Sequence, residues 1–239
     1  MARPNGVVIV SERFWAFATT SGELHEGTMA SPRRRSGKIP LLRGLLQLAA
    51  AVRPLARGGG VARRSERLFL IAAVVAPLFL VPLLPPELEL PVGGALTAAL
   101  VAWLMRGRTL RLHGAEHRAI AAAEHRSLLF AWDGTARPSR FAARCGTNFA
   151  ALALPVTVLF DRLWPFAAAP LVSSVVVAML SLGATMELWK AVQHPSGLLR
   201  GLILPGLLLQ RLTTREPSLD DTRIALRAAA SVLRRELDG

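Results

Sequence analysis

The apolar residues of this chain are gathered into blocks, and this blocking constrains the fold more than any other feature. One pair of apolar stretches covers 68–84 and 91–105, with a proline-rich connection at 85–90 between them. A second pair covers 148–160 and 165–184. A helix needs about 17 to 25 residues to cross a membrane, so 148–160 is the weakest span and could be re-entrant. We predict a mainly α-helical, multi-pass membrane protein with about four transmembrane helices.

The charge of the chain indicates how such spans would be oriented. Lys and Arg number 29 against 16 acidic residues, a formal net charge of +13. This balance is typical of proteins that bind nucleic acid or a membrane surface, and the mean hydropathy of +0.39 favours the membrane. Segment 106–147 carries eight Arg and the connection at 85–90 has none, while Lys and Arg collect in cytoplasmic loops. We therefore predict membrane lipid as a partner, no nucleic acid, and both termini in the cytoplasm.

The predicted spans divide the chain into soluble and membrane segments. The hairpins take 68–105 and 148–190. Residues 1–36 hold short β-rich runs separated by turn signals, which predict a small β meander. The basic segment 37–67 has an apolar helical face and predicts an amphipathic helix at the membrane interface. After the cytoplasmic segment 106–147 and the second hairpin, 191–239 is expected to lie along the membrane surface and to end in a cytoplasmic amphipathic helix.

One string in the cytoplasmic segment carries a pattern of metal chemistry. His113 and His117 are four residues apart, so on a helix both imidazoles can reach one ion. Glu116 between them gives the His-x-x-Glu-His order, in which two His bind zinc and the Glu is the general base. A third ligand must come from elsewhere, and Glu187, near the inner end of the last span, is one candidate because an unpaired carboxylate there is costly. The alternative is a solvated helix face without metal.

Two further segments carry candidate residues. Cys145 follows Arg144, a cation that favours the thiolate and makes the thiol a candidate ligand or nucleophile. A lone Cys is more often a small buried apolar residue, and as the single Cys it excludes an internal disulfide. Segment 210–217 is rich in side-chain donors. It could hold an anion or a lipid headgroup, or it could cap and anchor the helix that follows.

Together these strings resemble the YqhQ-like bacterial membrane proteins, a family of unknown function often described as predicted metal-dependent enzymes. The resemblance rests on the strings at 113–117, 144–147 and 210–217 and on Glu187, and it covers about residues 36 to 230. It implies a multi-pass membrane protein of bacterial origin and a metal site, but no established reaction. The family pattern has His-Pro where this chain has Ala142 and Ala143, which implies a smaller site or a different third ligand.

These observations lead to one main hypothesis and one alternative. The main hypothesis is an integral protein of the bacterial cytoplasmic membrane with a divalent metal, zinc, bound by His113 and His117, with Glu187 or Cys145 completing the site. Glu116 would activate a water for hydrolysis of a peptide or lipid-linked compound reached from the cytoplasmic face. The alternative is a non-catalytic scaffold or assembly factor in which the same residues pin the cytoplasmic segment onto the spans.

Overall fold

The β-rich runs near residue 1 form a four-stranded sheet. The computed structural model of the chain describes residues 1–29, 39–57, 61, 64–165, 170–193 and 201–238. The strands are β1 (Ala2–Arg3), β2 (Gly6–Val10), β3 (Phe14–Thr19) and β4 (Leu24–Thr28). Each pairs antiparallel with the next in the order β1-β2-β3-β4. The predicted meander is confirmed for the described part of 1–36.

The rest of the described chain is mainly helical, as predicted. The helices are α1 (Pro40–Arg57), α2 (Arg64–Leu80), the short 3-10 helix η2 (Val81–Leu83), α3 (Pro86–Leu104), α4 (Thr109–Glu124), α5 (Leu128–Asp133), α6 (Gly146–Leu163), α7 (Pro170–Gln193), α8 (Leu204–Thr213) and α9 (Leu219–Asp238). Helix α3 begins earlier than predicted, inside the connection at 85–90. Pro86 is favoured at the first position of a helix, and Glu87 complements the partial positive charge of a helix start.

Both faces of the sheet are covered. Successive side chains of a strand point to opposite faces, so Val7 and Ile9 of β2 pack on one side and Val8 on the other. Val8 meets Phe17 and Val61, whereas Val7 and Ile9 meet helices α4 and α9. Alanines line these two helices there: Ala115, Ala119, Ala122, Ala225, Ala228 and Ala229. The predicted C-terminal amphipathic helix is therefore confirmed as α9, and its apolar face covers the sheet.

Three helical segments of the described chain are long and apolar enough to cross a membrane. They are Arg64–Leu83, Glu87–Leu104 and Leu171–Gln193, and they account for three of the four predicted spans. Helix α6, which contains the weakest predicted span at 148–160, is not among them. Length and composition alone therefore support three spans rather than four.

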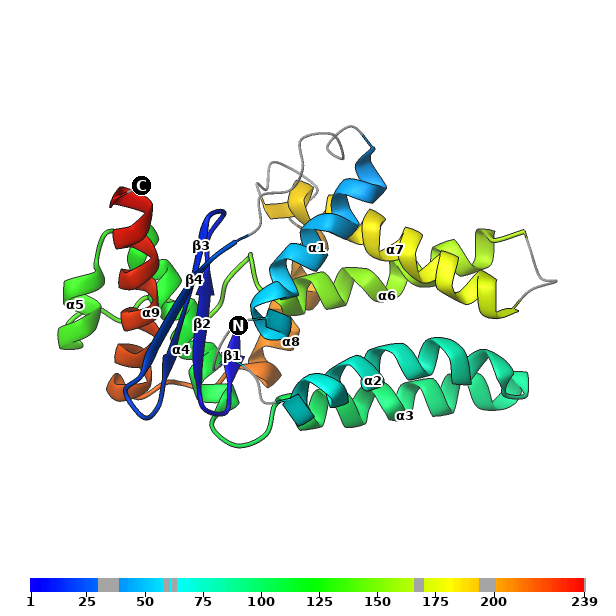
Figure 1. The fold of residues 1–239 in the computed structure, drawn as a ribbon, viewed down its shortest axis with the longest axis horizontal. Coiled ribbons are helices and arrows are strands. Elements are labelled where there is room, and N and C mark those ends of the chain that lie inside the picture. Colours follow the sequence, from blue (N-terminus) through cyan, green and yellow to red (C-terminus); the bar gives the residue numbers. More distant parts are fainter. Residues whose placement is uncertain (30–38, 58–60, 62–63, 166–169, 194–200, 239) are drawn as a thin grey trace.

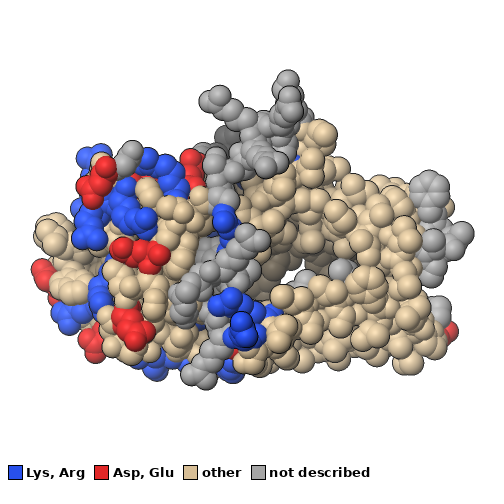
Figure 2. Space-filling view, in the orientation of Figure 1, with Lys and Arg blue, Asp and Glu red and all other residues tan. Residues whose placement is uncertain are grey.

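The molecule has a charged half and an apolar half. Figure 1 shows the sheet with α4, α5 and α9 at one end, and the helices α2, α3, α6 and α7 extending to the other end. Figure 2 shows that the visible Lys, Arg, Asp and Glu side chains gather over the end with the sheet, whereas the extended helices are nearly free of them. Helix α8 packs on α6 near the junction of the two halves.

Helix α1, predicted as an interfacial helix, packs directly on α7. A Cβ added at Gly44 would overlap the carbonyl oxygen of Gly183, and one added at Gly183 would lie 2.6 Å from the carbonyl oxygen of Leu41. The two backbones therefore touch. Beside this crossing, Arg43 donates through Nε to Glu187 at 2.9 Å and through a second nitrogen to the other carboxylate oxygen. Helix α1 is thus held on α7 by close backbone packing at Gly44 and Gly183 and by the ion pair between Arg43 and Glu187.

Candidate metal centre

Helix α4 brings the two predicted imidazoles together. His113 and His117 lie one turn apart on it, with ring centroids 4.5 Å apart, and they are only 9% and 2% exposed. Gly114 between them lets the segment after α8 pass directly over the helix. A Cβ added at Gly114 would overlap the carbonyl oxygen of Arg215 and lie 3.3 Å from Cδ of Pro217. The predicted solvated helix face is therefore wrong, because this face of α4 is buried.

Each imidazole is oriented by a backbone carbonyl. Nδ1 of His113 lies 2.8 Å from the carbonyl oxygen of Thr213, and Nδ1 of His117 lies 2.6 Å from that of Arg140. A carbonyl oxygen can only accept, so Nδ1 is the donor in both rings, and in the neutral rings Nε2 carries the lone pair. Metal-binding His residues are commonly held in this way, with the other ring nitrogen donating to a carbonyl or carboxylate.

Cys145 completes the group from helix α6. It is the N-cap residue of α6, it is 6% exposed, and its Sγ lies 3.2 Å from Nε2 of His113. Thr147 donates to the sulfur from its backbone nitrogen at 3.4 Å and from its hydroxyl at 3.1 Å. Burial raises the pKa of the Cys145 thiol, but hydrogen bonds from His113 and His117 outweigh it and lower that pKa to about 5. The thiolate, the form that binds metals, is therefore favoured.

Arg144, the cation expected from the sequence to favour this thiolate, is paired with another residue. Arg144 forms an ion pair with Glu124 at 3.3 Å. The charge that acts on the sulfur comes from the two His residues. The prediction that Cys145 favours the thiolate is therefore supported, but the groups that lower its pKa are the two His residues and not Arg144.

The three side chains could hold one metal ion. One ligand atom from each of His113, His117 and Cys145 lies within 4.8 Å of the other two. A tetrahedral zinc ion with nitrogen and sulfur ligands separates its ligand atoms by roughly 3.5 Å, so small side-chain movements would close the site. Two imidazoles and one thiolate are a donor set that suits zinc.

Glu187 lies outside this group. Both of its carboxylate oxygens are bound by Arg43 of α1, and no other His, Cys, Asp or Glu of the described chain joins the three ligands. Of the two predicted third ligands, the structure brings only Cys145 to the imidazoles. No local pattern indicates the ion pair between Arg43 and Glu187, because these residues are 144 positions apart.

Glu116 lies beside the two His residues on α4 without belonging to the ligand group. Its Oε1 accepts a hydrogen bond from the Met1 amino group at 2.6 Å, whereas Oε2 is buried and has no hydrogen-bond partner within the described residues. Burial raises the pKa of this carboxyl, but the charges of the Met1 amino group, His113 and His117 lower it overall. Glu116 is thus an ionised, buried carboxylate, and one of its oxygens has no hydrogen-bond partner among the described residues.

The fold and the site define a mainly helical protein with three apolar helices and a buried His-His-Cys group at the edge of its charged half. Residues 100–235, more than half of the chain, match the family described as "Protein of unknown function (DUF1385)", and the chain belongs to this family. No curated protein and no solved structure matches the chain. The matched region contains all three members of the group, and the narrower YqhQ-like assignment stays a prediction.

Proposed function

We propose that this protein is an integral metalloprotein of the bacterial cytoplasmic membrane, with one zinc ion held by His113, His117 and Cys145. The observation that carries the proposal is the orientation of the two imidazoles. Both donate through Nδ1 to backbone carbonyls, which leaves Nε2 of each neutral ring for a metal beside the Cys145 sulfur. A hydrogen bond from the ring nitrogen that does not bind the metal fixes the orientation of the imidazole and increases its basicity as a ligand.

Hydrolysis is the activity that this site supports best. Zinc with three protein ligands keeps a fourth position for water, and it lowers the pKa of that water toward about 7. Glu116 is ionised, lies on the same helix as both His ligands, and has an oxygen with no hydrogen-bond partner in the described chain. We assign it the role of general base. The substrate would be a peptide or a lipid-linked compound reached from the cytoplasmic face, because the site lies where the charged half meets α6.

A structural role for the same site is the second candidate. The three ligand side chains are 9%, 2% and 6% exposed, and together they connect α4, α6, the carbonyl of Arg140 and the end of α8. A metal in this position would fasten the charged half to the apolar helices without any reaction. This burial supports the predicted scaffold or assembly factor.

Replacing Glu116 by Gln separates the two candidates. The amide cannot take a proton, so a hydrolase is expected to lose activity by about a hundredfold or more, while the metal remains bound because Glu116 is not a ligand. The measurement is complementation of a strain that lacks the gene, alongside the metal content of each purified variant. A scaffold predicts that Glu116→Gln complements as well as the wild type, whereas His117→Ala fails in either case.

The connectivity of the charged half supports four crossings rather than three. Strands β2 and β3 pack on α4 and α9, so segments before α2, between α3 and α6, and after α7 belong to one body. A chain that leaves this body and returns must cross the membrane an even number of times. If α7 crosses, α6 crosses as well, and its 18 residues span about 27 Å at the usual helical rise.

Reporter fusions test this topology. Alkaline phosphatase, which is active only outside the cytoplasm, is expected to be active when fused after Leu163 and inactive when fused after Asp238. Green fluorescent protein fused after Asp238 is expected to fluoresce. An inactive phosphatase after Leu163 would contradict four crossings and would make α6 a helix of the cytoplasmic side.

A further inference from the structure

Helix α8 has one face buried in the protein and one face left exposed. Gly206 and Gln210 belong to the buried face: a Cβ added at Gly206 would overlap Asn148 of α6, and Gln210 is fully buried. The other face carries three leucines one turn apart, which are 58%, 56% and 75% exposed: Leu204, Leu208 and Leu212. A contiguous row of exposed apolar side chains is typical of an interaction surface.

This leucine face ends at the candidate metal centre. Leu212 precedes Thr213, whose carbonyl oxygen accepts the hydrogen bond from Nδ1 of His113 at 2.8 Å. At the usual helical rise, the face from Leu204 to Leu212 is about 12 Å long. A molecule that lies along it would therefore have one end beside the residues that hold the metal ligands.

Exposed apolar side chains continue along the neighbouring helix α6, on which α8 packs. Leu154 and Val158 of α6 are 71% and 51% exposed, and α6 carries no charged residue between Phe149 and Phe160. Figure 1 shows α8 at the junction of the charged half and the extended helices, and Figure 2 shows the molecule hollowed between α6–α7 and α2–α3. The surroundings of the leucine face are therefore hydrocarbon, and the occupant that matches them is a lipid acyl chain.

Two arginines at this end of α8 have unused guanidinium groups. Arg211 and Arg215 are exposed, and neither side chain forms a hydrogen bond or an ion pair within the described residues. Arg211 follows Leu208 by three residues, so it lies beside the leucine face. The next carboxylate in the sequence, Glu216, is paired with Arg118 at 2.6 Å. An apolar helix face edged by free arginines is typical of helices that bind anionic lipid.

We propose that α8 binds an anionic membrane lipid beside the metal centre. An acyl chain would lie along the leucine face, and Arg211 and Arg215 would pair with the charged headgroup. A lipid is favoured over a water-soluble partner because α8 lies next to helices that are long and apolar enough to cross a membrane. Together with the proposed function, on which this step rests, the surface assigns the zinc site a lipid-linked substrate rather than a peptide.

Photolabelling of the full chain in phosphatidylcholine nanodiscs tests the lipid site. The probe is a phosphatidylglycerol that carries a diazirine on one acyl chain. Trypsin cuts after Arg200 and Arg211, so residues 201–211 are recovered as one peptide. The wild type is expected to carry the label on this peptide. Unlabelled phosphatidylglycerol is expected to suppress the label more strongly than an equal amount of phosphatidylethanolamine.

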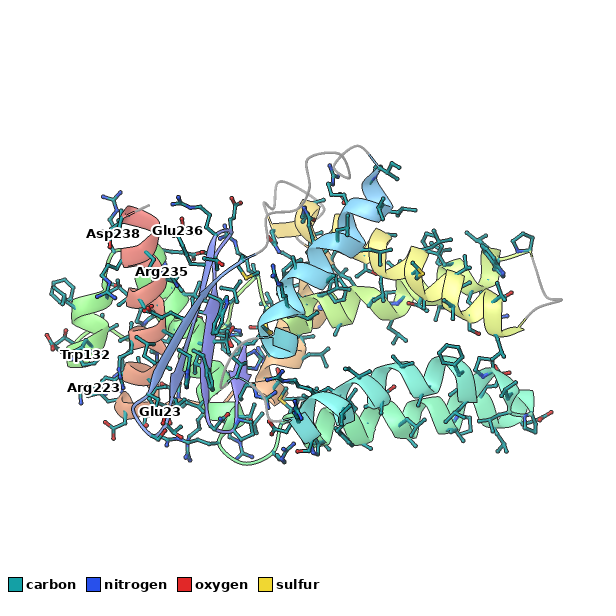
Figure 3. The ribbon with its side chains drawn as sticks, in the orientation of Figure 1. Glu23, Trp132, Arg223, Arg235, Glu236 and Asp238 are labelled. Atoms are coloured by element: carbon teal, nitrogen blue, oxygen red, sulfur yellow. The ribbon has the colours of Figure 1, made fainter. Side chains whose placement is uncertain are left out.

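Two variants and two matched controls locate the site. Arg211→Gln is expected to lower the labelling of α8 about fivefold, the effect of one Arg near an anionic lipid surface. Leu208→Gln is expected to lower it as well, and its exposed position leaves the core intact. Arg223→Gln changes an Arg of α9 that Figure 3 shows at the end opposite the apolar helices, and Leu237→Gln changes an 87% exposed leucine of α9. Both controls are expected to label like the wild type.

Three results would overturn the lipid site. They are the absence of label on 201–211 in the wild type, equal labelling of Arg211→Gln and Arg223→Gln, and equal suppression by the two unlabelled lipids. Protein stripped of zinc with a chelator is expected to carry the same label. A failed zinc site and a failed lipid site therefore give different results.

Complementation of the strain that lacks the gene tests the substrate class. Leu208→Gln is expected to keep its zinc and yet to complement poorly, because a lipid-linked substrate no longer docks on α8. Leu237→Gln is expected to complement like the wild type. Full complementation by Leu208→Gln with reduced labelling of α8 would contradict a lipid-linked substrate and favour a peptide.

Discussion

Replacing His117 by Ala is expected to remove the bound zinc, from about one equivalent per chain to less than a tenth. A structural zinc ion contributes on the order of 10 kcal/mol of binding free energy through all of its ligands together, so losing one of three protein ligands leaves a site too weak to survive purification. His117 is 2% exposed and its ring is fixed by the carbonyl of Arg140. Elemental analysis of the protein after gel filtration measures the metal directly.

The same measurement identifies the third ligand. Cys145→Ser is expected to lose most of the zinc, because a hydroxyl is a much poorer zinc ligand than a thiolate. Glu187→Gln is the matched control and is expected to keep the zinc, because its carboxylate binds Arg43 of α1. Retention by Cys145→Ser together with loss by Glu187→Gln would assign the third position to Glu187 and contradict the site described above.

Gly114→Ala is expected to have the second largest effect. We expect it to lower the free energy of unfolding, whereas a Gly→Ala change inside a helix usually raises it. Within a helix this change stabilises by up to about 1 kcal/mol. At Gly114 the added methyl group would overlap the carbonyl oxygen of Arg215. The backbone nitrogen of Arg215 donates to the carbonyl oxygen of Leu110 of α4 at 2.9 Å. Overpacking of this kind costs about 1 to 3 kcal/mol. We expect a lower free energy of unfolding and weaker zinc binding, because Thr213, the partner of His113, is displaced.

The control for this prediction is a helical glycine in open space. Gly94 of α3 has no atom within 4 Å of an added Cβ, so Gly94→Ala is expected to leave both thermal stability and zinc content unchanged or slightly higher. Thermal unfolding in detergent, followed by tryptophan fluorescence, compares the two variants. If Gly114→Ala unfolds at the same temperature as Gly94→Ala and retains its zinc, the close contact between Gly114 and the segment after α8 does not help to hold His113 against Thr213.

The local parts of the fold and the site could be predicted from the sequence. Two His residues four apart on a helix share a face wherever that helix lies, so the pairing of His113 and His117 follows from spacing alone. The sheet follows from short β-rich runs separated by turn signals, and α9 follows from the helical spacing of its apolar residues. These predictions need only neighbouring residues, and the structure confirms them.

The remaining contacts depend on how distant segments pack. The pair between Arg43 and Glu187 exists because Gly44 and Gly183 let two helix backbones touch, and no local pattern encodes that crossing. The hydrogen bonds that orient the imidazoles end on backbone carbonyls of Thr213 and Arg140, groups that every residue carries. Choosing Cys145 over Glu187 as the third ligand therefore required the tertiary structure.

X-ray absorption spectroscopy of the zinc-loaded protein tests the central claim most directly, because it reports the atoms bound to the metal. The account predicts stoichiometric zinc with one sulfur at about 2.3 Å and nitrogen or oxygen ligands at about 2.0 to 2.1 Å, and loss of the sulfur signal in Cys145→Ser. Zinc bound without a sulfur ligand, or purified wild-type protein that holds no stoichiometric metal after incubation with zinc, would contradict it.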